Sequence, residues 1–202
     1  MLRPKFDIAS LLSSMGYRDK PLFFRKKQII FSQGDRSEAI FYVEKGAVKL
    51  TVVAANGKEA FVGLLDGGDF FGESCLSFGQ PVRFHTATAV TDMQVLKIAR
   101  VPMIGTLRTK PEFAYGLILY LLERNAQLQR ELASTRLNST EERVVQVLSF
   151  VERLGGSGRV VPSLTQQDLA NIVGITRQRV NVVLQRLRKS ASARPADPRR
   201  KN

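Results

Sequence analysis

The chain has 202 residues, of which 44% are apolar, and it carries a net charge of +13 with a single cysteine and a single histidine. This length suits one large domain or two small ones, and no apolar run approaches the roughly 20 residues that a membrane span needs. One cysteine excludes an internal disulfide framework and cysteine-rich zinc or iron–sulfur sites. We therefore expect a cytoplasmic protein with no membrane partner.

The positive charge is concentrated in the C-terminal third of the chain. From Arg143 onward there are twelve basic and three acidic residues, a net charge of +9. Such an asymmetry favours a polyanionic partner, with a merely soluble basic surface as the alternative.

Residues 1–19 are interrupted too often by polar side chains for the apolar core of a signal peptide. They are more typical of a short amphipathic helix that turns Phe6, Ile8, Leu11 and Leu12 inward.

Residues 22–99 have the pattern of many short strands, in which apolar or alternating runs such as "AIFYVEKGAVKL" are separated by glycine-containing turns. Asn56-Gly57 lies between two such runs and predicts a two-residue hairpin turn with positive φ at both positions. Many short strands with regular turns predict a β-sandwich, a jelly roll or a small barrel.

Residues 111–137 predict one long helix. Pro111 suits a first helical turn, and apolar residues follow at spacings of three, four or seven, interrupted by polar Arg124. A helix of this length would be roughly 40 Å long, which exceeds what one small domain needs. We expect two copies of the chain to pair along it. The alternative is a helix that packs only on its own β-domain.

The segment "LTQQDLANIVGITRQRVNVVLQRLRK" predicts a helix-turn-helix. Thr165 and Asp168 suit the start of its first helix, Gly174 suits the turn, and Thr176 suits the start of the second helix, which we expect over residues 177–189. Ala170 supplies the small residue that two closely packed helices need at their contact. An ordinary helical hairpin is the alternative.

In a helix-turn-helix that binds DNA, the N-terminal residues of the second helix face the base edges of the major groove. Arg177, Gln178 and Asn181 are the candidates for base contacts, because arginine pairs with guanine while glutamine and asparagine pair with adenine. Thr176 and Arg179 are better placed for phosphates. For Arg179 a solvated cationic face is an equal alternative.

The order of these parts resembles the cAMP receptor protein/FNR family of bacterial transcription regulators. The resemblance rests on "FYVEKGAVKL", "GDFFGE", a downstream arginine and "LTQQDLANIVGITRQRV". It implies an α+β fold, with a cyclic-nucleotide-binding-like β-roll (jelly roll), a long dimerisation helix and a helix-turn-helix. It also implies a homodimer that binds a palindromic site in double-stranded DNA, with RNA polymerase as a further partner. The expected boundaries are 1–108 for the effector domain, 109–137 for the dimerisation helix, 138–190 for the helix-turn-helix domain and 191–202 for a disordered basic tail.

In relatives that bind cyclic nucleotides, a Gly-Glu pair, two following amides and an arginine surround the ribose and phosphate. The resemblance carries these roles to Gly72 and Glu73, to the amides of Ser74 and Cys75, and to Arg83. Phe84, however, stands where the family places a hydroxyl. The neighbourhood of its Thr-Ser pair is occupied instead by Asn125, Gln127, Leu128 and Gln129. We therefore expect an altered or degenerate pocket, with a cyclic nucleotide or another small anionic effector as its ligand. A haem held by Cys75 and His85 is an alternative, as against a cysteine that is simply a small buried hydrophobe.

After the second helix, "RKSASARPADPRRKN" has neither the glycine nor the strand pattern of the β-hairpin wing that the family usually carries. The wing is expected to be missing, which leaves open a second function: a ligand-binding or interaction module whose DNA binding is lost or non-specific. We expect no enzymatic activity and no metal site, because one histidine supports neither a catalytic triad nor a multi-histidine centre.

Overall fold

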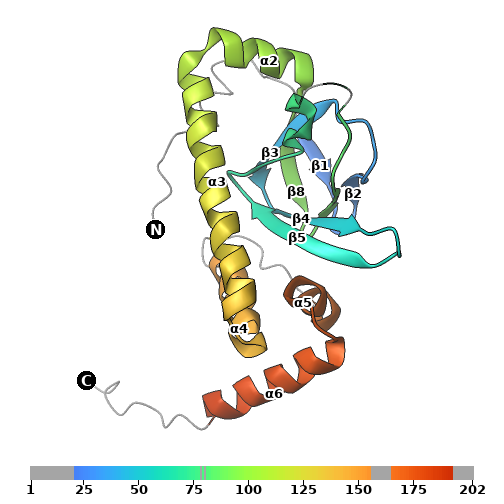
Figure 1. The fold of residues 1–202 in the computed structure, drawn as a ribbon, viewed down its shortest axis with the longest axis vertical. Coiled ribbons are helices and arrows are strands. Elements are labelled where there is room, and N and C mark those ends of the chain that lie inside the picture. Colours follow the sequence, from blue (N-terminus) through green and yellow to red (C-terminus); the bar gives the residue numbers. More distant parts are fainter. Residues whose placement is uncertain (1–20, 78, 80, 156–164, 193–202) are drawn as a thin grey trace, which may run out of the picture.

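The computed structural model describes residues 21–77, 79, 81–155 and 165–192. Within them, two four-stranded antiparallel sheets form the β-roll, with strand orders β1-β8-β3-β6 and β2-β7-β4-β5. The strands are β1 (Leu22–Phe24), β2 (Ile29–Phe31), β3 (Ala39–Lys45), β4 (Ala47–Val53), β5 (Glu59–Asp66), β6 (Phe70–Phe71), β7 (Thr86–Ala89) and β8 (Met93–Ala99). The predicted jelly-roll class is confirmed (Figure 1).

The core of the β-roll lies between the two sheets. Phe31, Phe41 and Phe71 come from β2, β3 and β6, and their ring centroids are 5.1–5.9 Å apart. Val43 and Val48 are fully buried on either side of the tight β3–β4 turn. The short, mostly apolar strands form because each can bury one face against the opposite sheet.

The β4–β5 hairpin forms where the sequence indicates, but the predicted two-residue turn is wrong. Ala54 N–H donates to Lys58 O at 2.9 Å, and Gly57 N–H donates to Ala54 O at 2.9 Å. The loop between Ala54 and Lys58 therefore has three residues. Gly57 has a φ of 77°, whereas Asn56 is not among the residues with positive φ. Asn56 Oδ1 instead accepts a hydrogen bond from Lys58 N–H, which stabilises the longer turn.

Two helices follow the β-roll, α2 (Arg100–Thr109) and α3 (Pro111–Leu137). The long helix has the predicted range, with Pro111 in its first turn. Phe113 and Leu117 of α3 are buried in a second core cluster with Ile98 of β8 and Met103 of α2. The N-terminal half of α3 is therefore attached to its own β-roll, which it runs beside in Figure 1.

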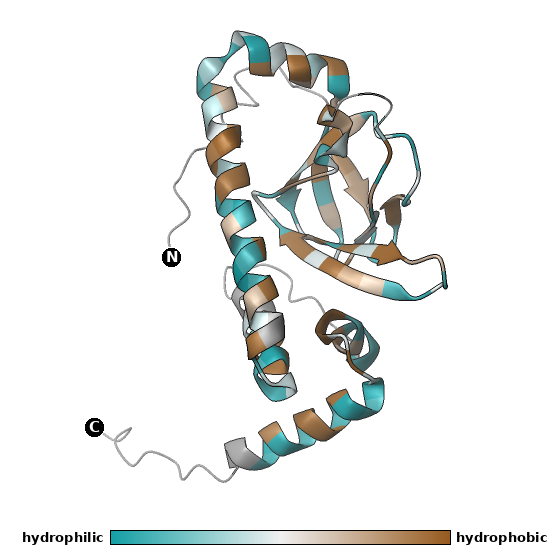
Figure 2. Cartoon of the chain, viewed as in Figure 1, coloured by the Kyte–Doolittle hydropathy of each residue, from teal (hydrophilic) through white to brown (hydrophobic). Residues whose placement is uncertain are grey.

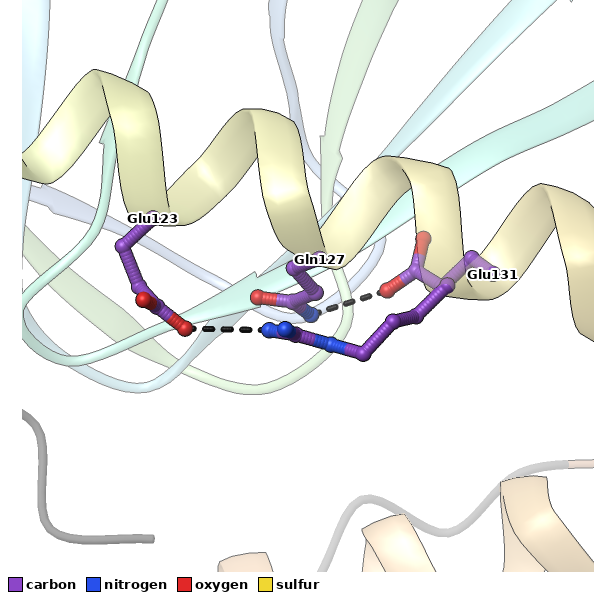
Figure 3. Close-up of polar contacts among 4 residues, drawn as sticks. Glu123, Gln127 and Glu131 are labelled. Carbon is purple, nitrogen blue, oxygen red and sulfur yellow. Dashed lines mark hydrogen bonds and ion pairs between the residues drawn. The ribbon is translucent and has the colours of Figure 1, made fainter.

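Hydrophobic and hydrophilic bands alternate along α3 (Figure 2). Several large apolar side chains of α3 are exposed, among them Tyr115, Ile118, Leu122 and Leu132, which lie at helical spacings. A different face is polar, as Figure 3 shows: Arg130 forms an ion pair with Glu123 at 3.0 Å, and Gln127 donates to Glu131 at 2.8 Å.

The helix-turn-helix domain contains α4 (Thr140–Gly155), α5 (Gln166–Val173) and α6 (Arg177–Ser192). Its buried core is Val144, Leu169, Ala170, Val173, Val180 and Val183. Thr165 and Asp168 form the predicted capping box, and Gly174 ends α5 with a φ of 72°. Local signals thus fix both ends of α5, and α6 continues three residues beyond its predicted end.

The helix-turn-helix lies at the opposite end of the molecule from α2, and α5 contacts strand β5 of the β-roll (Figure 1). The predicted N-terminal helix and the predicted absence of a wing concern residues 1–20 and 193–202, which lie outside the described residues. Within the described part of the chain, no helix combines the length and apolar character that crossing a membrane requires.

Candidate DNA interface and effector cavity

The start of α6 presents a row of exposed polar side chains. Arg177 and Gln178 are exposed in its first turn, and Asn181 is exposed one turn later. Val180 and Val183 are buried on the other side of the same helix, against α5 and α4. The buried valines therefore fix the rotation of α6, and that rotation directs the three polar side chains outward.

Two further predicted contact residues flank this row. Thr176 Oγ1 accepts a hydrogen bond from Arg179 N–H at 3.2 Å, which sets the first turn of α6. Both residues are exposed. Between Arg177 and Ser192 the sequence holds five basic residues and no acidic one. One of them, Arg186, pairs with Glu141 of α4 at 3.0 Å and so joins α6 to α4.

Three of the residues predicted to surround the ligand, Glu73, Ser74 and Cys75, lie in a tight turn, the short 3-10 helix η1 (Glu73–Leu76). Gly72 precedes it with a φ of 78°, and its carbonyl accepts from Cys75 N–H at 3.3 Å. The hydroxyl of Ser74 is hydrogen-bonded to that of Ser37 at 2.8 Å. Arg100 Nε donates to Cys75 O at 2.7 Å. The turn is thus stabilised by its own protein contacts.

Arg83 is turned into the protein. Its Nη1 donates to Gly72 O and its Nη2 donates to Ala39 O, both at 2.8 Å. The guanidinium carbon lies 4.1 Å from the centre of the Phe31 ring, and the residue is only 5% exposed. Its Nε is buried and has no hydrogen-bond partner among the described residues. The guanidinium therefore caps carbonyls and stacks on a ring in this structure, and a phosphate contact by Arg83 stays a prediction.

Burial also shifts the pKa of two further groups near the turn, Cys75 and His85. Burial raises the pKa of the Cys75 thiol to about 11, although Arg83 and Arg100 act in the opposite direction. The thiol is fully buried in the second core cluster and stays protonated at neutral pH. Burial lowers the pKa of His85, so its imidazole is neutral there. A protonated, fully buried thiol matches the small-hydrophobe interpretation of Cys75.

A cavity of about 120 Å³ lies between the β-roll and α3. Of the five residues predicted to surround a ligand, only Glu73 lines it. Most of the lining is apolar, and His85 together with Tyr120 and Arg124 of α3 supplies its other polar groups. The lining residues are Ile40, Leu50, Val62, Leu65, Phe70, Glu73, Leu76, His85, Leu117, Tyr120, Leu121, Arg124 and Leu128.

Arg124 is the charged residue of this cavity for which the sequence motifs predict no ligand-binding role. The available signal was a charged residue interrupting the apolar stripe of residues 111–137. Typical small-molecule pockets have volumes of about 300–1,000 Å³, so this cavity is small. With Arg83 engaged by carbonyls, the described residues do not form an open cradle for a cyclic nucleotide.

A larger cleft, about 450 Å³, separates the outer face of β4, β5 and β7 from α5. Lys27, Lys49 and Asp168 are among the charged residues that line it. Among the described residues, no group of three or more histidine, cysteine, aspartate or glutamate side chains is placed to hold a metal ion.

Two family models match the chain: a cyclic nucleotide-binding domain over residues 21–109 and a Crp-like helix-turn-helix domain over residues 142–194. The chain is 30% identical to a global nitrogen regulator of Synechococcus elongatus, covering 94% of this chain and 90% of that protein. It is also 30% identical to a cyclic AMP receptor protein of Thermus thermophilus, covering 86% and 79%.

Solved structures share the fold. The global regulator CLP of Xanthomonas campestris, described as responsive to c-di-GMP, matches with a TM-score of 0.74 at 18% identity, covering 95% of this chain and 96% of that one. TTHA1359, a CRP/FNR-family transcriptional regulator of Thermus thermophilus, matches with a TM-score of 0.68 at 25% identity, covering 88% and 90%.

A cyclic-nucleotide-binding-type β-roll, joined through a long helix to a helix-turn-helix, defines a DNA-binding transcription regulator under the control of a small ligand. The similar curated proteins are transcriptional regulators and not enzymes. The chain belongs to the cAMP receptor protein/FNR family, as its sequence motifs predict.

Proposed function

We propose that the protein reads a palindromic DNA sequence as a homodimer, with one helix-turn-helix in each half-site. Arg177, Gln178 and Asn181 contact base edges, while Thr176 and Arg179 contact phosphates. The observation that carries the proposal is the exposed row at the start of α6, held outward by buried Val180 and Val183. A recognition helix in the major groove uses its N-terminal residues in this way.

Pairing of two chains along α3 would relate their helix-turn-helix units by a two-fold axis, which matches the symmetry of a palindromic site. The exposed apolar side chains of α3 support this arrangement, because their burial against a second copy would remove them from water. A contact with RNA polymerase stays a prediction.

A preferred sequence is first selected from random DNA, and binding to it is then compared with binding to scrambled DNA. Arg177→Ala and Gln178→Ala should each reduce the preference for the selected sequence by about 1–3 kcal/mol, roughly 5- to 150-fold. Arg179→Ala should weaken binding to all sequences alike. It should also reduce the slope of log affinity against log salt concentration by about one. Arg130→Ala is the matched control, since it removes one positive charge from the polar face of α3.

The same measurements decide the second function. A protein that binds every sequence equally, with a steep dependence on salt, is a non-specific binder, and the sequence-reading role of α6 is then wrong. Retention of full preference by both Arg177→Ala and Gln178→Ala would contradict the assignment of base contacts.

A further inference from the structure

The cavity between the β-roll and α3 contains one cation. An added Cβ on Gly63 would lie 3.2 Å from Arg124 Nη2, so the guanidinium of Arg124 lies directly over strand β5 at this glycine. Arg124 is partly buried, and its guanidinium forms no hydrogen bond or ion pair with any residue in the described part of the chain. A partly desolvated guanidinium with unused donors is a strong site for a planar anion such as a carboxylate.

An acid lines the same cavity. Glu73 begins η1 and lines the cavity from the β-roll; it is exposed to solvent, and its carboxylate forms no ion pair or hydrogen bond with the described residues, although its charge acts on Arg83 and His85. No ion pair joins the carboxylate of Glu73 to the guanidinium of Arg124. Two opposite charges that line one small cavity without forming an ion pair are complementary to a ligand with an anionic group and a hydrogen-bond donor.

The rest of the cavity is suited to an apolar ligand body. Leu65, Phe70 and Leu117 line it, and the volume is about 120 Å³. His85 is neutral at pH 7, because burial lowers its pKa, and so adds no charge. The volume admits a body of a few carbon atoms, and the cation expected to bind a phosphate, Arg83, is occupied by the carbonyls of Gly72 and Ala39.

We propose that this cavity binds a small carboxylic acid with a short branched or straight apolar chain and a hydroxyl or ammonium group next to the carboxylate. Arg124 binds the carboxylate, Glu73 accepts a hydrogen bond from the adjacent donor, and the apolar chain enters the β-roll. The inference rests on the ligand-controlled role of the β-roll and names the class of its ligand. Such a ligand links η1 of the β-roll to α3, and so couples binding to the helix expected to hold the dimer together.

Calorimetry on the full chain tests the proposal with a series of related probes: 2-hydroxyisocaproate, leucine, isocaproate, 3-methylbutanol and cAMP. The two acids with a neighbouring donor should bind best, isocaproate about tenfold more weakly, and 3-methylbutanol should not bind. Arg124→Gln should weaken binding of all three acids at least tenfold. Glu73→Ala should remove the advantage of the hydroxy and amino acids over isocaproate.

Two further variants separate binding from folding. Gly63→Val keeps the charge of Arg124 but displaces its guanidinium from β5, and should also weaken acid binding. Arg130→Gln, on the polar face of the same helix, should leave binding unchanged. Each variant is compared only if its melting temperature matches that of the natural chain.

Three results would overturn the proposal: no binding of the acids at millimolar concentration, binding that Arg124→Gln leaves intact, or binding of cAMP in preference to the acids. DNA binding of the same preparations is measured in parallel. A chain that binds its preferred DNA sequence but no acid contradicts only the class of ligand, whereas a chain that binds the acids but no DNA contradicts only the proposed DNA reading.

Discussion

Arg83 Nη1 donates a hydrogen bond to the carbonyl oxygen of Gly72 at 2.8 Å. The two residues lie so close that a Cβ on Gly72 would collide with that nitrogen. Gly72 also has a φ of 78°, in the left-handed region that other residues rarely adopt. The glycine thus serves two purposes, a backbone conformation and space for an arginine side chain.

Gly72→Ala should therefore cost more than backbone strain alone. Gly34 provides the matched control, because its φ is 89° and an added Cβ would meet no atom within 4 Å. Gly34→Ala should lower the free energy of unfolding by about 1–2 kcal/mol. Gly72→Ala should lower it by about 2 kcal/mol more, because Arg83 loses charged hydrogen bonds to buried carbonyls. Urea denaturation of the two variants measures the difference, and equal losses would contradict a supporting role for the arginine.

The helix-turn-helix is the part of the structure that the sequence predicts best, because its signals are local. Thr165 and Asp168 are three residues apart and satisfy each other's backbone donors. Gly174 supplies the positive φ that ends α5, and Ala170 is fully buried where the helices meet. Each of these residues acts on neighbours within a few positions, so a pattern of residue types is sufficient.

The effector cavity could be predicted only in part, because its contacts are long-range. Arg83 turns inward to the carbonyl of Ala39, 44 residues earlier, and no local pattern indicates that partner. The role of Arg124 likewise depends on β5, which passes beneath it at Gly63. A family pattern gives the types of residue present at a site, whereas side-chain orientation follows from the packing around them.

The chain should lose stability in mildly acidic solution through its single histidine. Burial lowers the pKa of His85 below its ordinary value of 6.5, with Arg83 acting in the same direction and Glu73 opposing both. In the unfolded chain the imidazole takes up a proton near pH 6.5, while in the folded chain it stays neutral to lower pH. Between these two pKa values the unfolded state binds more protons, so the free energy of unfolding falls as pH decreases, by at most about 1.4 kcal/mol per pH unit.

Denaturation of the natural chain and of His85→Gln between pH 7.5 and about 5 isolates this contribution, because carboxylates of ordinary pKa titrate mainly below that range. The variant should show a flatter dependence of stability on pH. Parallel curves for the two proteins would show that His85 titrates equally in the folded and unfolded chains.

The exposed apolar face of α3 predicts the oligomeric state. Leu122 is 59% exposed, and Ile118, four residues earlier, is 54% exposed on the same face. Leu122→Glu should convert the proposed dimer to a monomer, because a carboxylate at a helix–helix seam is buried without a partner. Affinity for a palindromic site should then fall steeply, since two linked half-site contacts become independent.

The neighbouring residue Glu123 supplies the control for the dimer test. It lies on the polar face shown in Figure 3, where its ion pair with Arg130 is exposed to solvent. Glu123→Ala should leave both the dimer and DNA binding intact, because exposed ion pairs contribute only about 0–1 kcal/mol. Sedimentation equilibrium at micromolar concentration distinguishes the two variants. A Leu122→Glu chain that remains dimeric would show that the dimer interface lies on another surface and that this face of α3 does not mediate pairing.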